Sequence, residues 1–585
     1  MICKLTVRGL LFLSLACSGL LSADVAIAQS VEIPPEVLGA ERERIEIMRQ
    51  AAPAVVAIFA ASGQGGGSGV IISPDGYTVT NFHVVEGQGP FMKCGLNDGN
   101  IYDAVLVGID PTGDVALIQM LGRDDFPTAR IGNSDDVRIG DWTFAMGNPF
   151  LLAEDLQPTV TYGMVSGTHR YQYPAGTFLE YTDCIQVDTS INPGNSGGPL
   201  FNERGELIGI NGRISVEKRG RVNVGAGYAI SINQVQHFLD HLKSGRIVDH
   251  ATLGATVTST SDGAVIVANI LERSSAFQKG LRSGDELITF AGRPIRSVNQ
   301  FKNILGIYPK GWVLPLSYRR EGKRGDIQVR LMALHRAAEL SPDGPGPAGP
   351  EDKEPDEKEP PKPLPIPGLP HPKPSIPEQY AHLFKAKRGF VNYYFNEQKQ
   401  QQLLMAFDGW GDFAPLKGLW TMNFQRTDGL EMQIKLSDKA LAARFGQDFI
   451  VQPLDQEYRD LPAGTGGLLA AMQQFRHLLS GPHEYFTEFY YLGSEPLDGG
   501  EQRVDVVMST RGLVTSRWYF QRNPPALVGF DTTLSDDVPP CEIRFGETLQ
   551  ANSLTMPKNW QLRYLDQDLG TFVLQNMSLE AGETK

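Results

Sequence analysis

The run Gly194-Asn195-Ser196-Gly197-Gly198-Pro199 places a serine between closely spaced glycines. Glycine adopts backbone conformations that other residues avoid, so such a chain can turn tightly and point two N–H groups at one place. In that arrangement Ser196 would be a nucleophile, and the N–H groups of Gly194 and Ser196 would hold the negative charge of an acyl-transfer intermediate. The alternative is a glycine-rich turn that contains a serine by chance.

A serine hydroxyl needs a base to remove its proton, and the base needs a third group to hold it in one tautomer. His83 follows an apolar, strand-like stretch at 69–79, and Asp114 lies in a turn that leads into an apolar strand. Taken alone, His83 could be a structural histidine and Asp114 a turn residue. However, the order His83, Asp114, Ser196 is that of double β-barrel proteases of the chymotrypsin type. We therefore predict a triad with His83 as general base and then acid, Asp114 as its orienting group and Ser196 as nucleophile.

An ordered set of motifs between residues 67 and 230 resembles the HtrA (Deg) family of trypsin-like serine proteases. The set includes Gly67-Ser68-Gly69-Val70, Thr80 to Val85, the Asp114 turn, Gly147-Asn148-Pro149-Phe150, Ile191-Asn192-Pro193 and Gly225-Ala226-Gly227-Tyr228. The resemblance implies two packed antiparallel β-barrels and ATP-independent endoproteolysis of unfolded or mislocalised proteins. We expect no cofactor, and no spacing of cysteine and histidine indicates a metal site.

The resemblance also places the primary specificity pocket around the nucleophile and shortly after it. The matching positions are Asn192, Ile210, Gly212, Gly225 and Ala226. None is charged, so we expect small or medium aliphatic side chains to be preferred, unless a loop residue such as Arg213 reaches in. A hydrophobic pocket separates neighbouring aliphatic side chains by only about 1–3 kcal/mol per methylene. Cleavage should therefore be broad, with unfolding of the substrate as the main filter.

Residues 252–334 alternate as strands and include the runs 263–267 and 284–288. Their succession resembles a PDZ domain of the bacterial protease-associated kind, a partly open barrel with two helices. Such domains add a peptide to a sheet edge and hold its carboxylate with backbone N–H groups. The residues that match this role are Leu253, Gly254 and Ala255 in a loop, with Val298, Phe301 and Leu305 at helical spacing beside it. The last three are equally consistent with ordinary core residues.

The first 28 residues have the pattern of a secretory signal peptide. Lys4 and Arg8 precede an apolar run at 9–21, and Ala26-Ile27-Ala28 is a cleavage pattern. A membrane anchor is the weaker alternative because the run is shorter than the roughly 20 residues of a span; a lipoprotein signal at Cys17 is a second alternative. We expect export to a bacterial periplasm or cell envelope. The net charge of −14 argues against a nucleic-acid-binding protein.

The fold class expected is mainly β, in five parts. These are a signal peptide (1–28), a trypsin-like double β-barrel (40–248), a PDZ domain (250–336), a Pro-rich acidic linker (338–378) and an α+β accessory domain (379–585). Fourteen prolines at 341–377 indicate an extended segment. In the last part, we expect strands at 485–491, 503–509, 514–520, 542–545 and 571–577, with an amphipathic helix at 468–479. This succession resembles periplasmic carriers of lipoproteins or lipids without sharing a motif, so a plain accessory or substrate-presenting domain is preferred.

Two other functions remain open as alternatives to a simple peptidase. One is a PDZ-regulated chaperone, and the other is a stress sensor whose peptidase acts only when a misfolded partner binds. The expected partners are unfolded polypeptides and C-terminal peptides at the PDZ domain. The family implies a homotrimer, but residues 31–50, which help to build it through aromatic contacts, contain no aromatic residue here.

Overall fold

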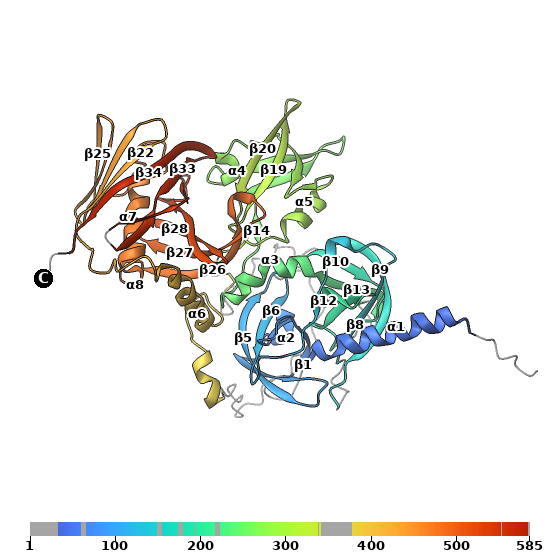
Figure 1. The fold of residues 1–585 in the computed structure, drawn as a ribbon. Helices are drawn as coiled ribbons and strands as arrows, with labels where there is room; N and C mark the ends of the chain where they lie inside the picture. Colours follow the sequence, from blue (N-terminus) through green and yellow to red (C-terminus); the bar gives the residue numbers. More distant parts are fainter. Residues whose placement is uncertain are drawn as a thin grey trace, which may run out of the picture. The chain divides into compact units, whose positions relative to one another are not determined.

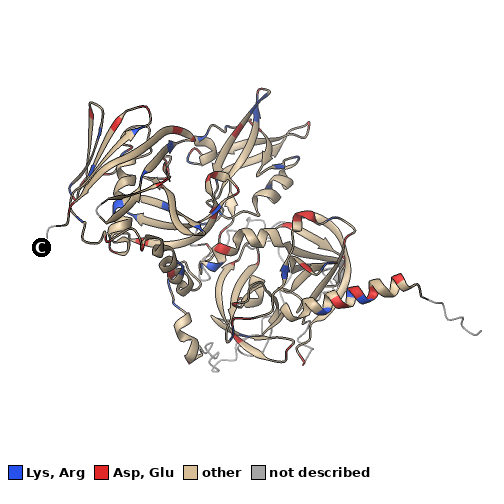
Figure 2. Ribbon diagram, viewed as in Figure 1, with Lys and Arg blue, Asp and Glu red and all other residues tan. Residues whose placement is uncertain are grey.

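The computed structural model describes residues 33–59, 66–148, 155–172, 179–191, 194–216, 223–336, 339–340, 377–551 and 553–582. The predicted signal peptide and most of the predicted linker lie outside these residues. The chain forms two units, at 1–48 and 49–585. Helix α1 (Pro35–Ala51) begins in the first unit, and acidic and basic side chains alternate along it (Figure 2). None of the described helices combines the length and the hydropathy needed to cross a bilayer.

Six antiparallel strands close the first barrel in the order β1-β2-β3-β6-β5-β4 (Figure 1). They are β1 (Val55–Phe59), β2 (Gly66–Ile71), β3 (Tyr77–Thr80), β4 (Phe91–Gly95), β5 (Ile101–Asp110) and β6 (Val115–Met120). Branched side chains favour strands and fill the interior, where Ile58, Ile71 and Ile118 are fully buried. The short helix α2 (Phe82–Val85) follows β3.

A second barrel follows in the order β11-β8-β9-β10-β13-β12, and β11 pairs with both β8 and β12, so that the ring closes. Its strands are β8 (Trp142–Gly147), β9 (Thr159–Gln172), β10 (Tyr181–Val187), β11 (Pro199–Asn202), β12 (Glu206–Val216) and β13 (Asn223–Ser231). The two-residue strand β7 (Arg130–Ile131) pairs in parallel with β12. Helix α3 (Ile232–Lys243) follows β13.

We call the next part, from β14 to β21, the middle module. It contains the sheet β15-β16-β17-β19-β20, with β18 on β17, and the separate pair β14-β21. The strands are β14 (Ala251–Thr252), β15 (Ala255–Ser259), β16 (Val265–Ile270), β17 (Glu286–Phe290), β18 (Arg293–Pro294), β19 (Val313–Arg320), β20 (Lys323–Arg330) and β21 (Met332–Ala333). The helices are α4 (Ser275–Gln278) and α5 (Val298–Leu305). Serine hydroxyls at 274 and 297 cap the two helices by accepting from backbone N–H groups.

We call the part from α6 to β34 the C-terminal module. Its sheet has eleven antiparallel strands in the order β25-β24-β23-β22-β34-β33-β30-β29-β28-β27-β26. The strands are β22 (Trp420–Arg426), β23 (Glu431–Leu436), β24 (Ala440–Phe445), β25 (Asp448–Pro453), β26 (Glu488–Pro496), β27 (Arg503–Arg511), β28 (Val514–Arg522), β29 (Pro525–Thr533), β30 (Cys541–Phe545), β33 (Asn559–Tyr564) and β34 (Gln567–Leu579). A hairpin of β31 (Thr548–Ala551) and β32 (Leu554–Pro557) stands apart from it.

Helices α6 (Tyr393–Leu404), α7 (Leu468–Ser480) and α8 (Pro482–Tyr485) complete the C-terminal module. Helix α7 packs its apolar face on the large sheet (Figure 1). Phe475 of this helix stacks on Phe530 with ring centroids 5.8 Å apart and meets the edge of Trp560 at 5.0 Å. The prediction of a mainly β fold, with a double barrel and an α+β C-terminal part, is confirmed. The domain boundaries remain predictions.

Candidate active site

The turn between β5 and β6 presents Asp114. Its φ is +55°, a left-handed conformation that aspartate tolerates better than most residues. Asp110 stabilises this turn because its Oδ1 accepts hydrogen bonds from the N–H groups of Thr112 (3.2 Å) and Gly113 (2.8 Å). The other oxygen of Asp110 lies 2.8 Å from Nε2 of His250, which is fully buried. Asp114 itself is about 1% exposed, so its carboxylate is fixed in a dry environment.

His83 lies on α2 and faces this carboxylate. Its backbone N–H donates to Oδ1 of Asp114 at 3.0 Å, and its ring Nδ1 lies 3.0 Å from Oδ1 and 2.8 Å from Oδ2. A carboxylate beside Nδ1 places the ring proton on that nitrogen and leaves Nε2 free to accept a proton. The His83 side chain is 46% exposed, so the free nitrogen is within reach of a substrate.

The environment of His83 shifts its pKa in two opposing directions. Burial lowers the pKa, whereas the hydrogen bond and the negative charge of Asp114 raise it by more. The net result is a pKa above the ordinary value of 6.5. The imidazolium that forms when His83 takes a proton is therefore stabilised by its neighbour.

The turn that contains Ser196 is held against the first barrel. The N–H of Ser68 donates to the carbonyl of Ser196 at 2.9 Å, and the Oγ of Ser68 donates to the carbonyl of Gly194 at 2.6 Å. Gly194 and Gly197 have φ values of +102° and +81°. A Cβ at residue 197 would come within 2.2 Å of Thr80 Oγ1, so the turn requires glycine there.

The N–H groups of Gly194 and Ser196 have no hydrogen-bond acceptor among the described residues. They are therefore available to the oxyanion of an acyl-transfer intermediate. The hydroxyl of Ser196 points at the carbonyl of Gly212, 3.5 Å away, and within the described ranges it makes no hydrogen bond to His83. Catalytic hydrogen bonds are often long or misaligned before substrate binds.

Tyr181, at the start of β10, is a site residue that the sequence reasoning missed. Its hydroxyl donates to Oδ2 of Asp114 at 2.6 Å, and the residue is about 3% exposed. Its ring lies against Gly212, where a Cβ would come within 2.8 Å of the ring. No motif marks a tyrosine 67 residues after the aspartate, so only the packing of the two barrels reveals the contact.

The predicted specificity-pocket residues are only partly placed. Ile210 and Gly212 lie on β12, with Ile210 fully buried, and Ala226 lies on the neighbouring strand β13. Gly225 also belongs to β13, but its surroundings are not described, and Asn192 lies outside the described residues. The preference for aliphatic side chains remains a prediction.

The predicted peptide-binding residues of the middle module are buried or partly buried. Leu253 and Phe301 are 1% and 2% exposed and belong to the core of the module. For Phe301, an ordinary core position was one of the two alternatives that the sequence left open. Val298 is partly buried against the same core. Gly254 has a φ of +74°, and Ala255 opens β15, the outer strand of its sheet.

Helix α5 reaches the peptidase barrels through Asn303, which is about 3% exposed. Its Oδ1 accepts from the N–H of Asp183 at 2.6 Å, and its Nδ2 donates to the carbonyl of His169 at 3.0 Å. A metal site is not evident: in the described part of the chain, no group of three or more His, Cys, Asp or Glu side chains is placed to hold a metal ion.

The two barrels and one family model define the class of this part of the chain. Residues 67–210 match the model of the trypsin-like peptidase domain. The chain therefore contains a domain of the trypsin-like peptidase class.

Individual proteins similar to this chain indicate which trypsin-like peptidases it resembles. The chain is 37% identical over 297 residues to the periplasmic serine endoprotease DegP of Escherichia coli (strain K12), a match that covers 47% of this chain and 60% of DegP. It is 36% identical over 274 residues to a probable DegP-like periplasmic serine endoprotease of Chlamydia trachomatis (serovar D), which covers 45% and 53% of the two chains. Among solved structures, the HtrA-type protease AlgW with a tripeptide is 30% identical with a TM-score of 0.41, covering 49% of this chain and 96% of AlgW.

The resemblance to the HtrA (Deg) family is thus confirmed for the peptidase region. The chain spans between about half and three-fifths of the length of these curated relatives, and more than half of the chain lies outside the matches.

Proposed function

We propose that this chain is an exported serine endopeptidase of the HtrA type, which hydrolyses peptide bonds in unfolded or mislocalised polypeptides of the periplasm or cell envelope. One observation carries the proposal: both oxygens of the buried Asp114 lie within 3.0 Å of Nδ1 of His83. This leaves Nε2 as the proton acceptor, on an exposed ring in the same peptidase domain as the Ser196 turn.

The mechanism follows from these positions. Ser196 Oγ turns from the carbonyl of Gly212 toward Nε2 of His83, gives up its proton and attacks the scissile carbonyl. The N–H groups of Gly194 and Ser196 hold the oxyanion. His83 then protonates the leaving amine, and water releases the acyl group by the same route in reverse. Asp114 keeps the imidazole in one tautomer throughout and stabilises its charged form.

The middle module would supply peptide recognition. Strand β15 pairs with β16 on one side only, so its other edge can accept a peptide as an added strand. The loop at 253–255 lies at the start of that edge and would hold a C-terminal carboxylate with its N–H groups. We include a homotrimer in the proposal only because the chain resembles the HtrA (Deg) family.

A second candidate function is a sensor or chaperone with little basal proteolysis. The observation in its favour is the hydrogen bond of Ser196 Oγ to Gly212 in place of His83. A peptide that binds the middle module would then have to reorient the nucleophile. Activation of at least tenfold by an added apolar C-terminal peptide would favour this candidate over a constitutive peptidase.

The test is degradation of casein by the mature chain and by Ser196→Ala. We expect the mature chain to degrade casein and the variant to lose essentially all cleavage. Ser73→Ala, which removes the hydroxyl that donates to Asp75, should cleave like the parent. Equal cleavage by Ser196→Ala, or none by the mature chain with activating peptides present, would refute a Ser196-dependent peptidase.

A further inference from the structure

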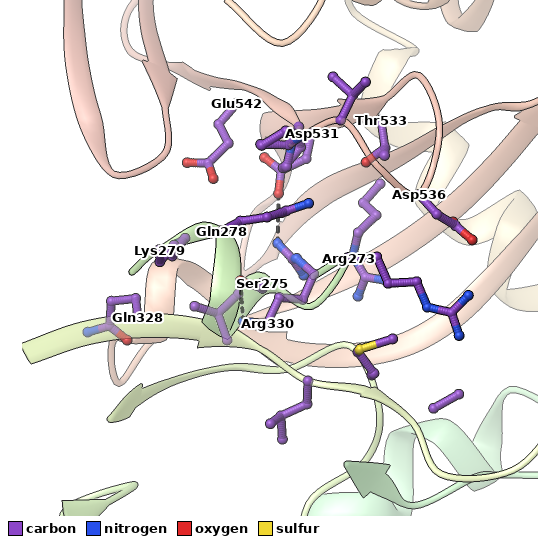
Figure 3. A pocket seen from close by; sticks show the side chains of 18 of the residues that line it. Arg273, Ser275, Gln278, Lys279, Gln328, Arg330, Asp531, Thr533, Asp536 and Glu542 are labelled. Atoms are coloured by element: carbon purple, nitrogen blue, oxygen red, sulfur yellow. Dashed lines mark hydrogen bonds and ion pairs between the residues drawn. The ribbon is translucent and has the colours of Figure 1, made fainter. Parts of the chain in front are cut away.

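A cavity of about 950 Å³ lies between the middle module and the C-terminal module (Figure 3). One wall comes from α4, β20 and β21, and the opposite wall comes from β29, β30 and the loop between them. The described residues that line it begin at Thr252, so none of them belongs to the peptidase barrels. The volume is at the upper end of the roughly 300–1,000 Å³ of ligand sites, which occur preferentially between domains.

Ion pairs across the cavity fix its two walls. Arg330 of the middle module lies 2.7 Å from Asp531 (Figure 3). It also lies 3.0 Å from Glu495, and both carboxylates are about 2% exposed. Asp531 forms a second ion pair with Arg544, at 2.7 Å, and Arg544 also forms an ion pair with Asp498. These charges are matched within the protein, so a ligand gains little by binding to them.

Two other cations of the lining are unmatched. Arg273 and Arg336 are exposed, and within the described part of the chain their guanidinium groups have neither a hydrogen-bond nor an ion-pair partner. Lys279, by contrast, pairs with Asp566 at 2.6 Å. A guanidinium presents a planar fork of donors that matches a carboxylate. The cavity therefore offers two free groups for acidic side chains.

The remaining lining selects among anionic ligands. Asp536 and Glu542 also face the cavity, and burial together with the charge of Asp531 raises the pKa of Glu542 (Figure 3). These carboxylates lower the net positive charge of the lining, which disfavours the dense, uniform charge of a polyphosphate or a nucleic acid more than the widely spaced carboxylates of a peptide. Gln328 also lines the cavity, and its Oε1 is buried against Gly499. Apolar side chains complete the lining at Leu271, Leu331, Met332, Val538 and Leu565.

We propose that this cavity binds an extended, acidic and partly apolar segment of a polypeptide. Arg273 and Arg336 bind its carboxylates, and the apolar lining receives its aliphatic side chains. The inference rests on the proposed function for the source of the segment, which is a part of the substrate remote from the scissile bond. The cavity thereby holds an unfolded chain while the triad cuts it.

The experiment measures binding without cleavage. Fluorescein-labelled, dephosphorylated β-casein, an acidic unfolded protein, is titrated with the full Ser196→Ala chain and followed by anisotropy at about 0.1 M salt. Adding Arg273→Glu and Arg336→Glu should raise the Kd about tenfold, because attraction is replaced by repulsion. The matched control, Lys323→Glu with Arg388→Glu, makes the same change of charge at exposed residues outside the cavity and should stay within about twofold.

Cleavage by the active chain separates this inference from the proposed function. The cavity variant should raise the KM for casein about tenfold and leave cleavage of a short chromogenic peptide unchanged. Equal Kd values for the cavity and control variants would overturn the inference, while Ser196-dependent cleavage would still stand. Displacement of casein by phosphatidylglycerol vesicles would also overturn it, in favour of a lipid headgroup. All four substituted side chains are exposed, so thermal unfolding should be unchanged in both variants.

Discussion

Three polar contacts converge on the carboxylate of Asp114. Its Oδ1 receives the backbone N–H of His83, its two oxygens face the ring of His83, and Oδ2 receives the hydroxyl of Tyr181. These contacts fix the carboxylate against the ring of His83. The hydrogen bond and the negative charge of Asp114 raise the pKa of His83, which favours uptake of the serine proton.

The pH dependence of cleavage should report this charge. Only neutral His83 can accept a proton, and its pKa is raised above 6.5. The acidic limb of kcat/KM should therefore have its midpoint above pH 6.5, with activity rising as His83 loses its proton. Measurement of peptide cleavage from pH 5 to 9 checks this, and a rate that stays flat across the range would argue against His83 as the base.

Tyr181→Phe should slow the reaction and shift the acidic limb of the kcat/KM profile to higher pH. Without the hydroxyl, the charge on Asp114 is less dispersed and attracts the imidazolium more strongly, so the pKa of His83 rises and the midpoint moves to higher pH. Loss of one hydrogen bond to a charged group should lower kcat/KM about tenfold, or roughly 1.4 kcal/mol. Tyr102→Phe is the matched control, because that hydroxyl donates to the exposed Asp98 in the same barrel. An unchanged pH profile for Tyr181→Phe would show that the tyrosine is only structural.

At the scale of elements, the turn at 194–198 depends on contacts from both barrels. The N–H of Gly197 donates to the carbonyl of Asn211 on β12 at 2.8 Å, and Ser68 on β2 holds the carbonyls of Gly194 and Ser196. A glycine-rich sequence has many conformations available, so these bonds select the one that presents the nucleophile.

Gly197→Ala should therefore disrupt the turn. Its Cβ would meet Thr80 Oγ1 at 2.2 Å and the carbonyl of Ser68 at 2.3 Å, with the strain of a positive φ added. We expect a loss of about 3 kcal/mol of stability and at least a hundredfold loss of casein cleavage. Gly87→Ala has a similar φ of +73° with no heavy atom within 4 Å, so it isolates the cost of backbone strain. Differential scanning calorimetry with the cleavage assay makes the comparison, and equal effects of the two substitutions would refute the packing argument.

The C-terminal module shows where strand prediction from sequence succeeded and failed. The expected runs near 485–491, 503–509, 514–520, 542–545 and 571–577 correspond to β26, β27, β28, β30 and β34, and the helix expected at 468–479 is α7. Strands β22 to β25 were not expected. Polar residues alternate with buried ones there, as in β23, where Met432, Ile434 and Leu436 are buried and their neighbours face outward. Such short alternating segments become strands only because neighbouring strands and α7 cover one face.

At the scale of the molecule, Arg330 joins the middle and C-terminal modules. It pairs with Glu495 and Asp531, each of which is nearly fully buried. Without Arg330, Glu495 would keep only Arg517 and Asp531 only Arg544, so two buried carboxylates would lose part of their compensating charge. The joint between the modules should therefore be sensitive to this one side chain.

Arg330→Met should lower the stability of the full chain by about 3 kcal/mol, because methionine fills space but matches no charge. The control is Arg319→Met, whose partner Glu286 is partly exposed, and its loss should cost less than about 1 kcal/mol. Thermal unfolding of both variants by calorimetry tests the difference. Equal transition temperatures would mean that Arg517 and Arg544 alone satisfy the two carboxylates.

The sequence by itself determined the peptidase class and the mainly β fold, and it predicted the residues of the triad. Those features depend on motifs that are local, so residue type and order are enough to recognise His83, Asp114 and the glycine turn around Ser196. Only the tertiary structure decided how they are held. Tyr181 reaches Asp114 across 67 residues, β34 joins β22 to β33 at the end of the chain, and the cavity with Arg273 is formed by two modules together. Contacts between distant residues depend on how the barrels and sheets pack, and no local pattern of side chains encodes that packing.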